Sequence, residues 1–473
     1  MLIRLLLFHF LAGVGILSAA QPGNEPAYSS SADSTSRDVY TTIRSISIVG
    51  NRTTKTHIVE REIAFENGKT YLAHDLARRI RLSKEQLMNT LLFIGVEITT
   101  VEAGIDLADI QIRVRERWYL FPFPYFKVID RNWNEWINTY GASLSRVNYG
   151  LKVSENNLTG RNDKLNLWLI GGYTRQVSFN YTQPYLDKNL KHGMFLGFQY
   201  ARTREVNYAT NYDTLKFFKL PVFARTVITG NIGYSYRKGS RERHNIRFSL
   251  SRDKVDTAIS KLNPDFFGNG SSHAVFADLT YNFQYFNVDY IRYPLRGWYA
   301  DVYATKRFGH ELGNFSIGGK FLKSWKILKG TYFMLQAIGS VKLPFDQPYY
   351  NARLLGYGDL AMRGLEYVVV DGVAGGCLKS TARKKVLEFS IKNFIKKKST
   401  HRIPFTFYAK VFADMGYVYS RNAANNSRLA NKFIRSGGFG LDIMTIYDLI
   451  LKLDFSFNQL GSSGLYYHTG SDF

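Results

Sequence analysis

The chain has 473 residues, of which 45% are hydrophobic and 15% aromatic, and this composition excludes a disordered protein. A single cysteine, Cys377, excludes an intramolecular disulfide. The formal net charge of +24 would allow a nucleic-acid partner, but the basic residues are spread along the chain, so we expect solvated faces or contact with anionic membrane headgroups, and no nucleic acid.

The first twenty residues have the parts of a cleaved secretory signal. A basic residue, Arg4, precedes an apolar run that ends in the small residues "SAA" at positions 18–20. A transmembrane anchor is the alternative, although the apolar run is short for one. We therefore predict a signal peptide at residues 1–20 and a flexible polar leader at residues 21–39.

Residues 40–118 predict a small α+β domain. Its expected elements are a strand at 43–49, helices at 54–63 and 73–93, and strands at 96–102 and 108–118. This β-α-α-β-β order, with an "I.I.GN..T" opening, resembles a polypeptide-transport-associated (POTRA) domain. An ordinary small domain with a purely structural sheet edge is the alternative.

The POTRA resemblance implies a sheet edge that receives a strand from another protein, by β-augmentation. We place that edge at Val96, Ile98 and Val101.

From residue 119 to residue 473, helical patterns give way to long segments in which apolar and polar residues alternate. In "LILKLDFSFNQ", Leu451, Leu453 and Phe455 oppose Lys452 and Asp454. Strands of soluble sandwiches average about five or six residues, whereas these segments run longer, as a tilted membrane strand requires. We predict an all-β transmembrane barrel of about sixteen antiparallel strands, because only helices and closed barrels satisfy every backbone group in lipid.

A loop with the sequence "LAMRGLEYVVV" interrupts the barrel pattern and carries Arg363. Burying this cation without a partner would be costly. Alternation places Glu388 and Asp414 on the polar faces of the two following strands, so both should point into the lumen. We therefore predict that Arg363 bridges these two carboxylates and pins its loop inside the barrel; a solvated arginine without a partner is the alternative.

The strings "MRGLEY", "VLEFSI" and "FADMGYVYS" together resemble motifs of the BamA/TamA-like outer-membrane protein assembly superfamily. Further strings, "NNLTGRNDKLNL", "VSFNYTQPYL", "DYIRYPLRGWYADV" and "YHTGSDF", follow in the order of that superfamily. The resemblance implies a loop–lumen salt bridge and a weak seam between the first and last strands. The residues assigned to the bridge are Arg363, Gly364, Glu388 and Asp414, and those assigned to the seam are Phe126, Lys127, Val128, Gly470 and Phe473.

The resemblance implies an assembly factor in the bacterial outer membrane, with its POTRA-like domain in the periplasm. It would insert or translocate unfolded outer-membrane or secreted client proteins through the seam, in contact with outer-membrane lipid and with accessory outer-membrane lipoproteins. A two-partner-type secretion translocator and a passive porin-like barrel are alternatives. The sequence has no Gly-x-Ser-x-Gly, His-Glu-x-x-His or Cys/His pair, so we expect no enzyme activity, cofactor or metal.

Overall fold

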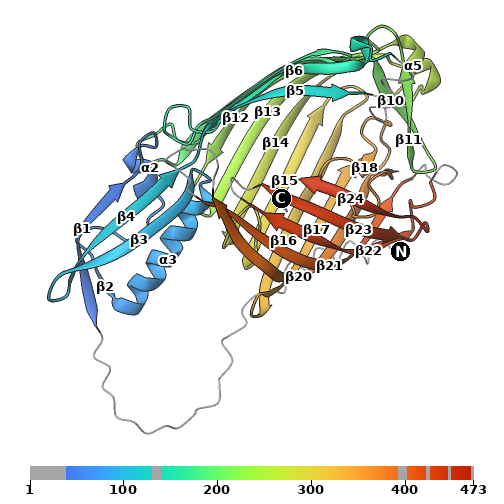
Figure 1. The fold of residues 1–473 in the computed structure, drawn as a ribbon. Coiled ribbons are helices and arrows are strands. Elements are labelled where there is room, and N and C mark those ends of the chain that lie inside the picture. The colour runs from blue at the N-terminus through green and yellow to red at the C-terminus, as the bar shows by residue number, and fades with distance from the viewer. Residues whose placement is uncertain (1–38, 130–140, 393–401, 422–426, 446–448, 470–473) are drawn as a thin grey trace.

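The computed structural model describes residues 39–129, 141–392, 402–421, 427–445 and 449–469 (Figure 1). The predicted signal peptide, all but the last residue of the predicted leader, and the seam residues Gly470 and Phe473 lie outside the described residues. No helix in the described ranges is long and apolar enough to cross a membrane.

The small domain precedes the barrel and packs two helices on a four-stranded sheet. Its elements are β1 (Tyr40–Val49), α2 (Thr56–Glu60), β2 (Thr70–Leu72), α3 (Ala73–Asn89), β3 (Phe93–Gly104) and β4 (Leu107–Glu116). The sheet order is β2-β1-β4-β3, and β1 runs parallel to β4. The sequence prediction missed β2, because three residues are too few to show a period.

Helix α3 is amphipathic, and its two faces have different partners. Leu76 and Leu87 are buried in the domain core together with Ile110 and Ile112 of β4. This apolar stripe holds the helix on the sheet, as expected for residues at helical spacing. The polar face of the helix contacts the barrel.

A single sixteen-stranded antiparallel sheet forms most of the rest of the described chain, in agreement with the predicted count. Its first eight strands are β5 (Leu120–Val128), β6 (Val147–Glu155), β7 (Lys164–Gly172), β8 (Arg175–Gln183), β9 (His192–Thr203), β12 (Arg225–Tyr236), β13 (Glu242–Val255) and β14 (His273–Val288). The other eight are β15 (Gly297–Phe308), β16 (Asn314–Leu328), β17 (Thr331–Leu343), β20 (Ala374–Lys392), β21 (Arg402–Tyr419), β22 (Phe433–Met444), β23 (Ile450–Asn458) and β24 (Ser463–Thr469).

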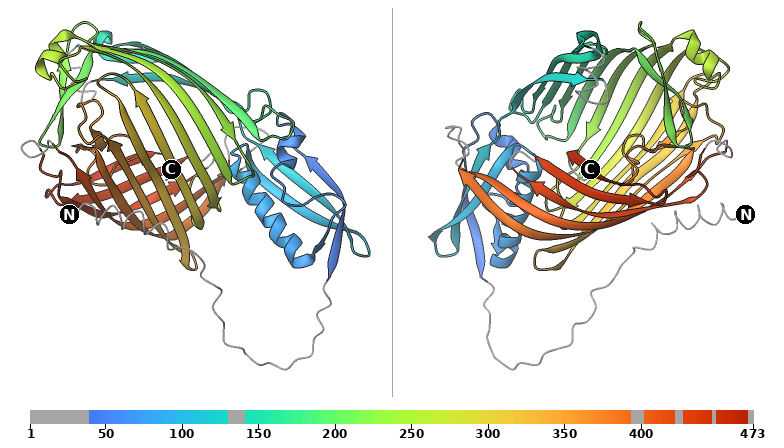
Figure 2. Two further views of the ribbon diagram at one scale, coloured as in Figure 1. Left: turned by 180° about the vertical axis from the view of Figure 1, so that it is seen from behind. Right: turned by 45° about the vertical axis from the view of Figure 1, so that its right-hand side comes forward.

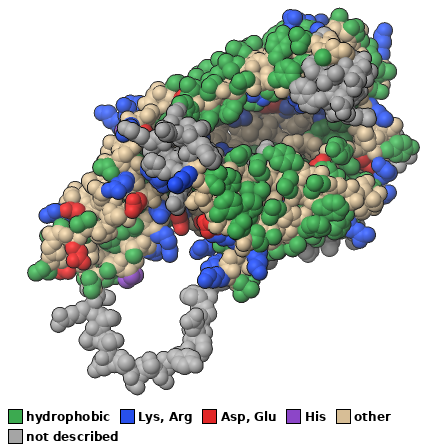
Figure 3. All heavy atoms as spheres, in the orientation of Figure 1, with side chains coloured by type: hydrophobic (Ala, Val, Ile, Leu, Met, Phe, Trp, Pro, Cys, Tyr) green, Lys and Arg blue, Asp and Glu red, His purple; other side chains and the backbone are tan. Residues whose placement is uncertain are grey.

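The two faces of the sheet differ in polarity. Phe439, Phe455 and Phe457 are exposed on the outer face, and apolar side chains cover much of the outside in the space-filling view (Figure 3). The inner face encloses a cavity of about 730 Å³ whose polar lining includes Asn180 and Asn231. An apolar outside and a polar inside are the reverse of a soluble protein and fit a barrel in lipid.

The small domain lies at one end of the barrel, which we call the near rim, and the opposite end is the far rim (Figures 1 and 2). The far rim carries elements that the sequence prediction missed: a hairpin of β10 (Glu205–Asn211) and β11 (Thr214–Lys219), helix α5 (Thr257–Leu262), the short pair β18 (Arg353–Leu355) and β19 (Val370–Asp371), and the one-turn 3-10 helix η1 (Leu144–Arg146). Residues 344–373, which join β17 to β20, form what we call the inward loop, because its apolar side chains pack against the lumen wall.

Candidate functional site

The inward loop is held by Arg363, which makes contacts with two strands of the wall. Its Nε donates to Asp414 Oδ2 at 2.9 Å, its backbone N–H donates to the same oxygen at 3.1 Å, and Nη2 bonds the other carboxylate oxygen. Nη1 donates to Thr381 Oγ1 at 2.9 Å, and Nη2 to the Ser380 carbonyl at 3.2 Å. The guanidinium also lies over the Phe412 ring, 4.0 Å from its centroid. Asp414 is fully buried, so this is a desolvated, bidentate ion pair.

Glu388 is not part of this contact, so the predicted bridge to two carboxylates is wrong in that respect. The ladder pairs Lys379 with Asp414 but Glu388 with Thr406. Glu388 therefore lies nine residues further along β20, about 30 Å away at the rise of a strand. It pairs instead with Lys385 near the near rim. Alternation predicted the face of each acid but could not give its height in the barrel.

Gly364, the neighbour of Arg363, is in a conformation that favours glycine. Its φ is +80°, and a Cβ added there would lie 3.1 Å from the Cβ of Ser456. Its carbonyl accepts a hydrogen bond from Asn458 Nδ2 at 2.6 Å. The Arg-Gly pair therefore links the inward loop to β20 and β21 on one side and to β23 on the other.

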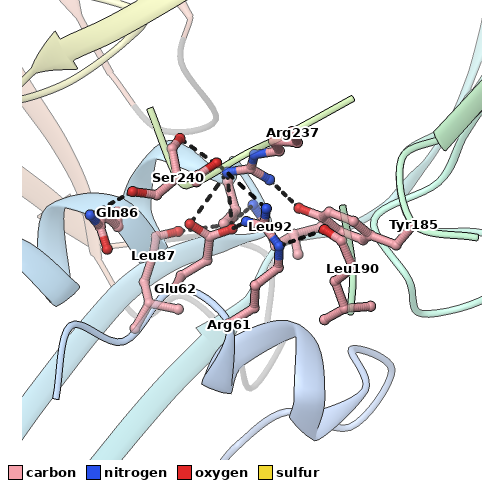
Figure 4. Close-up of polar contacts among 11 residues, drawn as sticks. Arg61, Glu62, Gln86, Leu87, Leu92, Tyr185, Leu190, Arg237 and Ser240 are labelled. Atoms are coloured by element: carbon pink, nitrogen blue, oxygen red, sulfur yellow. Dashed lines mark hydrogen bonds and ion pairs between the residues drawn. The ribbon is translucent and has the colours of Figure 1, made fainter. Parts of the chain in front are cut away.

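The second candidate site is the contact between the small domain and the near-rim turns, which we call the joint (Figure 4). Glu62 is 1% exposed and pairs with Arg61 at 2.8 Å and with Arg237 at 3.0 Å. Arg237, from the turn between β12 and β13, also bonds the Tyr185 hydroxyl. Arg61 Nε donates to the Leu190 carbonyl at 2.8 Å. One buried carboxylate thus holds an arginine from each domain.

The polar face of α3 completes the joint. Gln86 Nε2 donates to Ser240 Oγ at 2.8 Å, and Asn89 Nδ2 donates to the Val288 carbonyl at 3.2 Å. The Ile291 backbone N–H donates to Asn89 Oδ1 at 2.9 Å. The core of the small domain extends across the boundary, since Tyr185 and Leu190 of the barrel belong to its apolar cluster.

The turn 289–296, between β14 and β15, connects the joint to the opposite wall of the barrel. The Tyr293 hydroxyl donates to Asp442 Oδ2 at 2.8 Å. Asp442 pairs with Lys410 at 2.6 Å, and Lys410 also pairs with Asp454 at 2.7 Å. These charges are almost fully buried. Helix α3 is therefore connected through one turn to β21, β22 and β23.

Two carboxylates at the joint have perturbed ionisation. Burial raises the pKa of Glu85, and the negative charge of Asp289 raises it further, against Arg81, Arg241 and Arg296. Burial likewise raises the pKa of Asp289, although backbone N–H groups of the turn oppose this. Both groups line a cavity of about 400 Å³ between α3 and the near rim.

The predicted seam residues Phe126, Lys127 and Val128 lie in β5, which pairs with β6 on one side. Strands β5 and β24 stand at the two ends of the sheet, and the described residues form no ladder between them. The two strands lie apart in each view (Figures 1 and 2). The other half of the predicted seam, Gly470 and Phe473, falls outside the described residues.

Pro122 and Pro124 lie within β5, opposite Val153 and Leu151 of β6. Because proline has no N–H to donate, it fits a ladder only where its nitrogen points away from the partner strand. At these two positions that direction is the free edge of β5. The free edge thus lacks two donors in its near-rim half.

The predicted POTRA edge residues lie in β3, which is at the end of the small sheet and pairs only with β4 among the described strands. Val96 is buried, Ile98 packs against the core, and Val101 is 57% exposed. The outer edge of β3 is therefore available to another strand.

Sequence reasoning missed the joint and the cluster around Lys410. Charged residues at lumen-facing positions, such as Lys410, Asp442 and Asp454, were a signal that alternation could have found. Glu62 and Arg237 are 175 residues apart, and no local pattern pairs them.

Comparisons with known proteins identify the domain and the fold. Residues 41–117 match the POTRA family, described as a surface antigen variable number repeat. A search of curated proteins found no match. Among solved structures, the chain is similar to CdiB from Escherichia coli at 12% identity and a TM-score of 0.52, covering 91% of this chain and 76% of that one. It is also similar to BamA from Haemophilus ducreyi lacking POTRA domains 1–3, at 15% identity and a TM-score of 0.48, covering 91% and 83%.

Proposed function

We infer that this chain, a POTRA domain joined to a sixteen-stranded barrel with the fold of CdiB, is a protein-transport barrel of the bacterial outer membrane. The POTRA domain lies in the periplasm, so the near rim is periplasmic and the far rim faces the outside. The barrel inserts or translocates client proteins through the seam between β5 and β24. The role is mechanical: strands pair and separate, and no bond chemistry takes place.

The observation that carries this proposal is the pair of strand edges at the ends of the sheet. The free edges of β5 and β24 present backbone donors and acceptors without a ladder among the described residues. In lipid such groups cannot bond to water, so they favour any strand that pairs with them. An incoming client strand would gain the hydrogen bonds that the seam lacks.

The prolines of β5 restrict where a client can pair. A strand added at β5 meets two missing donors at Pro122 and Pro124, in the near-rim half of that strand. Pairing should therefore begin in the far-rim half of β5. This asymmetry leaves the near-rim half weakly bonded, so a client can enter there from the periplasm.

The POTRA domain would supply clients to this opening. Its free β3 edge can hold an extended segment by β-augmentation, and the joint fixes the domain against the near-rim turns. A client would therefore be held beside the barrel mouth, whether or not accessory lipoproteins take part.

Site-specific photo-crosslinking in cells tests this proposal. A photoreactive residue replaces Phe126 or Lys127 in the seam, or Val101 on β3, and Ile232, which is exposed on the outer face of β12, serves as the matched control. We expect client adducts at the seam and β3 positions and none at Ile232. Equal adduct yields at all four positions would refute selective pairing at the seam.

Translocation through the lumen is the second candidate, and the polar cavity of about 730 Å³ favours it. In that case adducts would form at lumen positions such as Asn231 and be absent at Phe126. A passive porin-like barrel is disfavoured by the inward loop, which Arg363 fixes in the lumen. Steady conductance of the purified protein in planar bilayers, comparable with that of an open porin, would favour the porin.

A further inference from the structure

A group of cations faces outward at the far rim. Arg175 begins β8 and Arg202 lies near the end of β9, where the two are direct cross-strand partners. Arg204 follows β9. The three guanidiniums surround one ring, that of Phe223, at 5.2, 4.2 and 5.3 Å from its centroid. We call these three arginines the rim cluster.

Alternation along the strands puts the rim cluster on the lipid side. Arg175 shares its face with Val177 and Phe179, and Arg202 shares its face with Phe198; these apolar residues are all exposed on the outside. The lumen side belongs to the other parity, as Asn180 and Gly197 show by their close approach inside the barrel. The rim cluster therefore lies at the outer end of the apolar band.

The same rung of the sheet continues with a lysine and a histidine. Arg202 pairs with Thr226 of β12, Thr226 pairs with Lys254 of β13, and Lys254 pairs with His273 of β14. Lys254 and His273 are exposed. One outward rung thus carries two arginines, a lysine and a histidine across five adjacent strands.

This arrangement has an electrostatic cost unless an anion compensates it. Like charges directly opposite on neighbouring strands are destabilising. Within the described ranges, none of the three arginines forms an ion pair with a carboxylate, and the Nε atoms of Arg202 and Arg204 are buried without a hydrogen-bond partner. Guanidinium groups bind phosphate oxygens in a bidentate manner, and a clustered set can hold one phosphate.

We propose that the rim cluster is a binding site for the phosphate of an anionic lipid headgroup in the outer leaflet. The level of the site, at the end of the apolar band and facing outward, selects a lipid over a soluble anion. Phe223 would pack beside the top of the acyl chains while the guanidiniums reach the headgroup. The site lies at the far-rim ends of β8 and β9 and just before β12, away from the seam, and it does not depend on the proposed transport function.

Native mass spectrometry of the purified full chain tests this site, with lipid A, a doubly phosphorylated glycolipid, as the probe. The test variant is R175Q/R202Q/R204Q, and the charge-retaining variant is R175K/R202K/R204K. The matched control, K216Q/K261Q/K432Q, removes three exposed cations from far-rim segments outside the cluster. Mobility on an unheated gel shows whether each variant is folded. If the triple glutamine variant fails to fold, the single variant R202Q replaces it.

We expect the parent and the matched control to bind lipid A equally. The glutamine variant should bind at least about tenfold more weakly, because charge-assisted hydrogen bonds are lost, and the lysine variant should fall between them. Equal binding by the parent and the glutamine variant would overturn the proposal. Displacement of lipid A by millimolar inorganic phosphate would show a site for free anions and would overturn the lipid assignment.

Discussion

At the residue scale, one arginine holds a long loop inside the barrel. Arg363 reaches a fully buried carboxylate, Asp414, so removal of either partner leaves the other charge desolvated and unpaired. Loss of one member of a buried pair typically costs about 3–5 kcal/mol. The pair fastens the inward loop to the wall and does not join the strands to one another. Its loss should therefore weaken the docking of the loop, while the hydrogen-bonded ladder of the barrel persists.

The variant Arg363→Ala should therefore insert normally but expose its inward loop. We expect limited proteolysis to cut within residues 344–373 much faster than in the parent, while mobility on an unheated gel stays unchanged. Glu388→Gln is the matched control, because Glu388 pairs with Lys385 and not with Arg363. A loop in Arg363→Ala as resistant as in the control would show that the ion pair does not hold it.

A second residue-scale prediction concerns pH at the joint. Burial and the charge of Asp289 raise the folded-state pKa of Glu85 above its ordinary value of 4.5. The folded state therefore binds more protons than the unfolded state between the two values, so the contribution of Glu85 to stability falls as pH rises through that interval.

Docking of α3 on the near-rim turns should accordingly tighten as the pH falls from neutral toward the ordinary pKa of Glu85. Hydrogen exchange of the α3 amides measures this directly. The variant Glu85→Gln should show slower exchange at neutral pH and less change on acidification. Identical pH profiles for the parent and the variant would contradict the assignment.

At the element scale, the contacts of the joint fix the POTRA domain to the near rim of the barrel. The near-rim turn with Tyr185 and Leu190 meets Arg61 of the small domain, and the turns with Ser240 and Ile291 both meet α3. Glu62 is central, since it accepts from an arginine on either side of the boundary. The turn 289–296 extends the connection to Asp442 of β22.

Replacement of Glu62 by Gln should loosen the joint, because two buried guanidiniums then lose the carboxylate that they share. Spin labels on α3 and on the outer face of β12 would report a broader distance distribution in the variant, with each domain still folded. Glu97→Gln is a suitable control, since its weak pair with Arg113 is exposed. A distribution as narrow as that of the parent would mean that the apolar contacts at Tyr185 and Leu190 suffice.

The sequence predicted elements better than it predicted contacts between them. Strand alternation identified the sixteen strands and the polar face of Asp414, because a period of two is local. It misplaced Glu388, because height in a barrel depends on the register of every preceding hairpin. Helix α5 was missed because its six residues are too few to show a helical period, and the hairpin β10–β11 was missed because burial along β10 does not alternate between two faces. The joint could not be predicted, since Glu62 and Arg237 meet only after the barrel curves.

At the scale of the whole molecule, the central claim is that client proteins pass through an opening of the sheet between β5 and β24. The two end strands form no ladder with each other among the described residues, and the prolines of β5 keep part of that edge weak. The inward loop is bonded to β21 and β23, and the joint is connected to β22. These contacts hold the remaining strands of the wall in place. Opening can then be confined to β5 and β24.

The most direct test is a reversible lock across the seam in reconstituted liposomes. Phe126→Cys and Leu465→Cys place one thiol on each end strand of the sheet, β5 and β24, and the folding rate of an unfolded client barrel is followed before and after reduction. The account predicts acceleration by the parent and by the reduced variant, and none by the oxidised, locked variant. Equal acceleration by the locked and reduced forms would contradict the seam as the route.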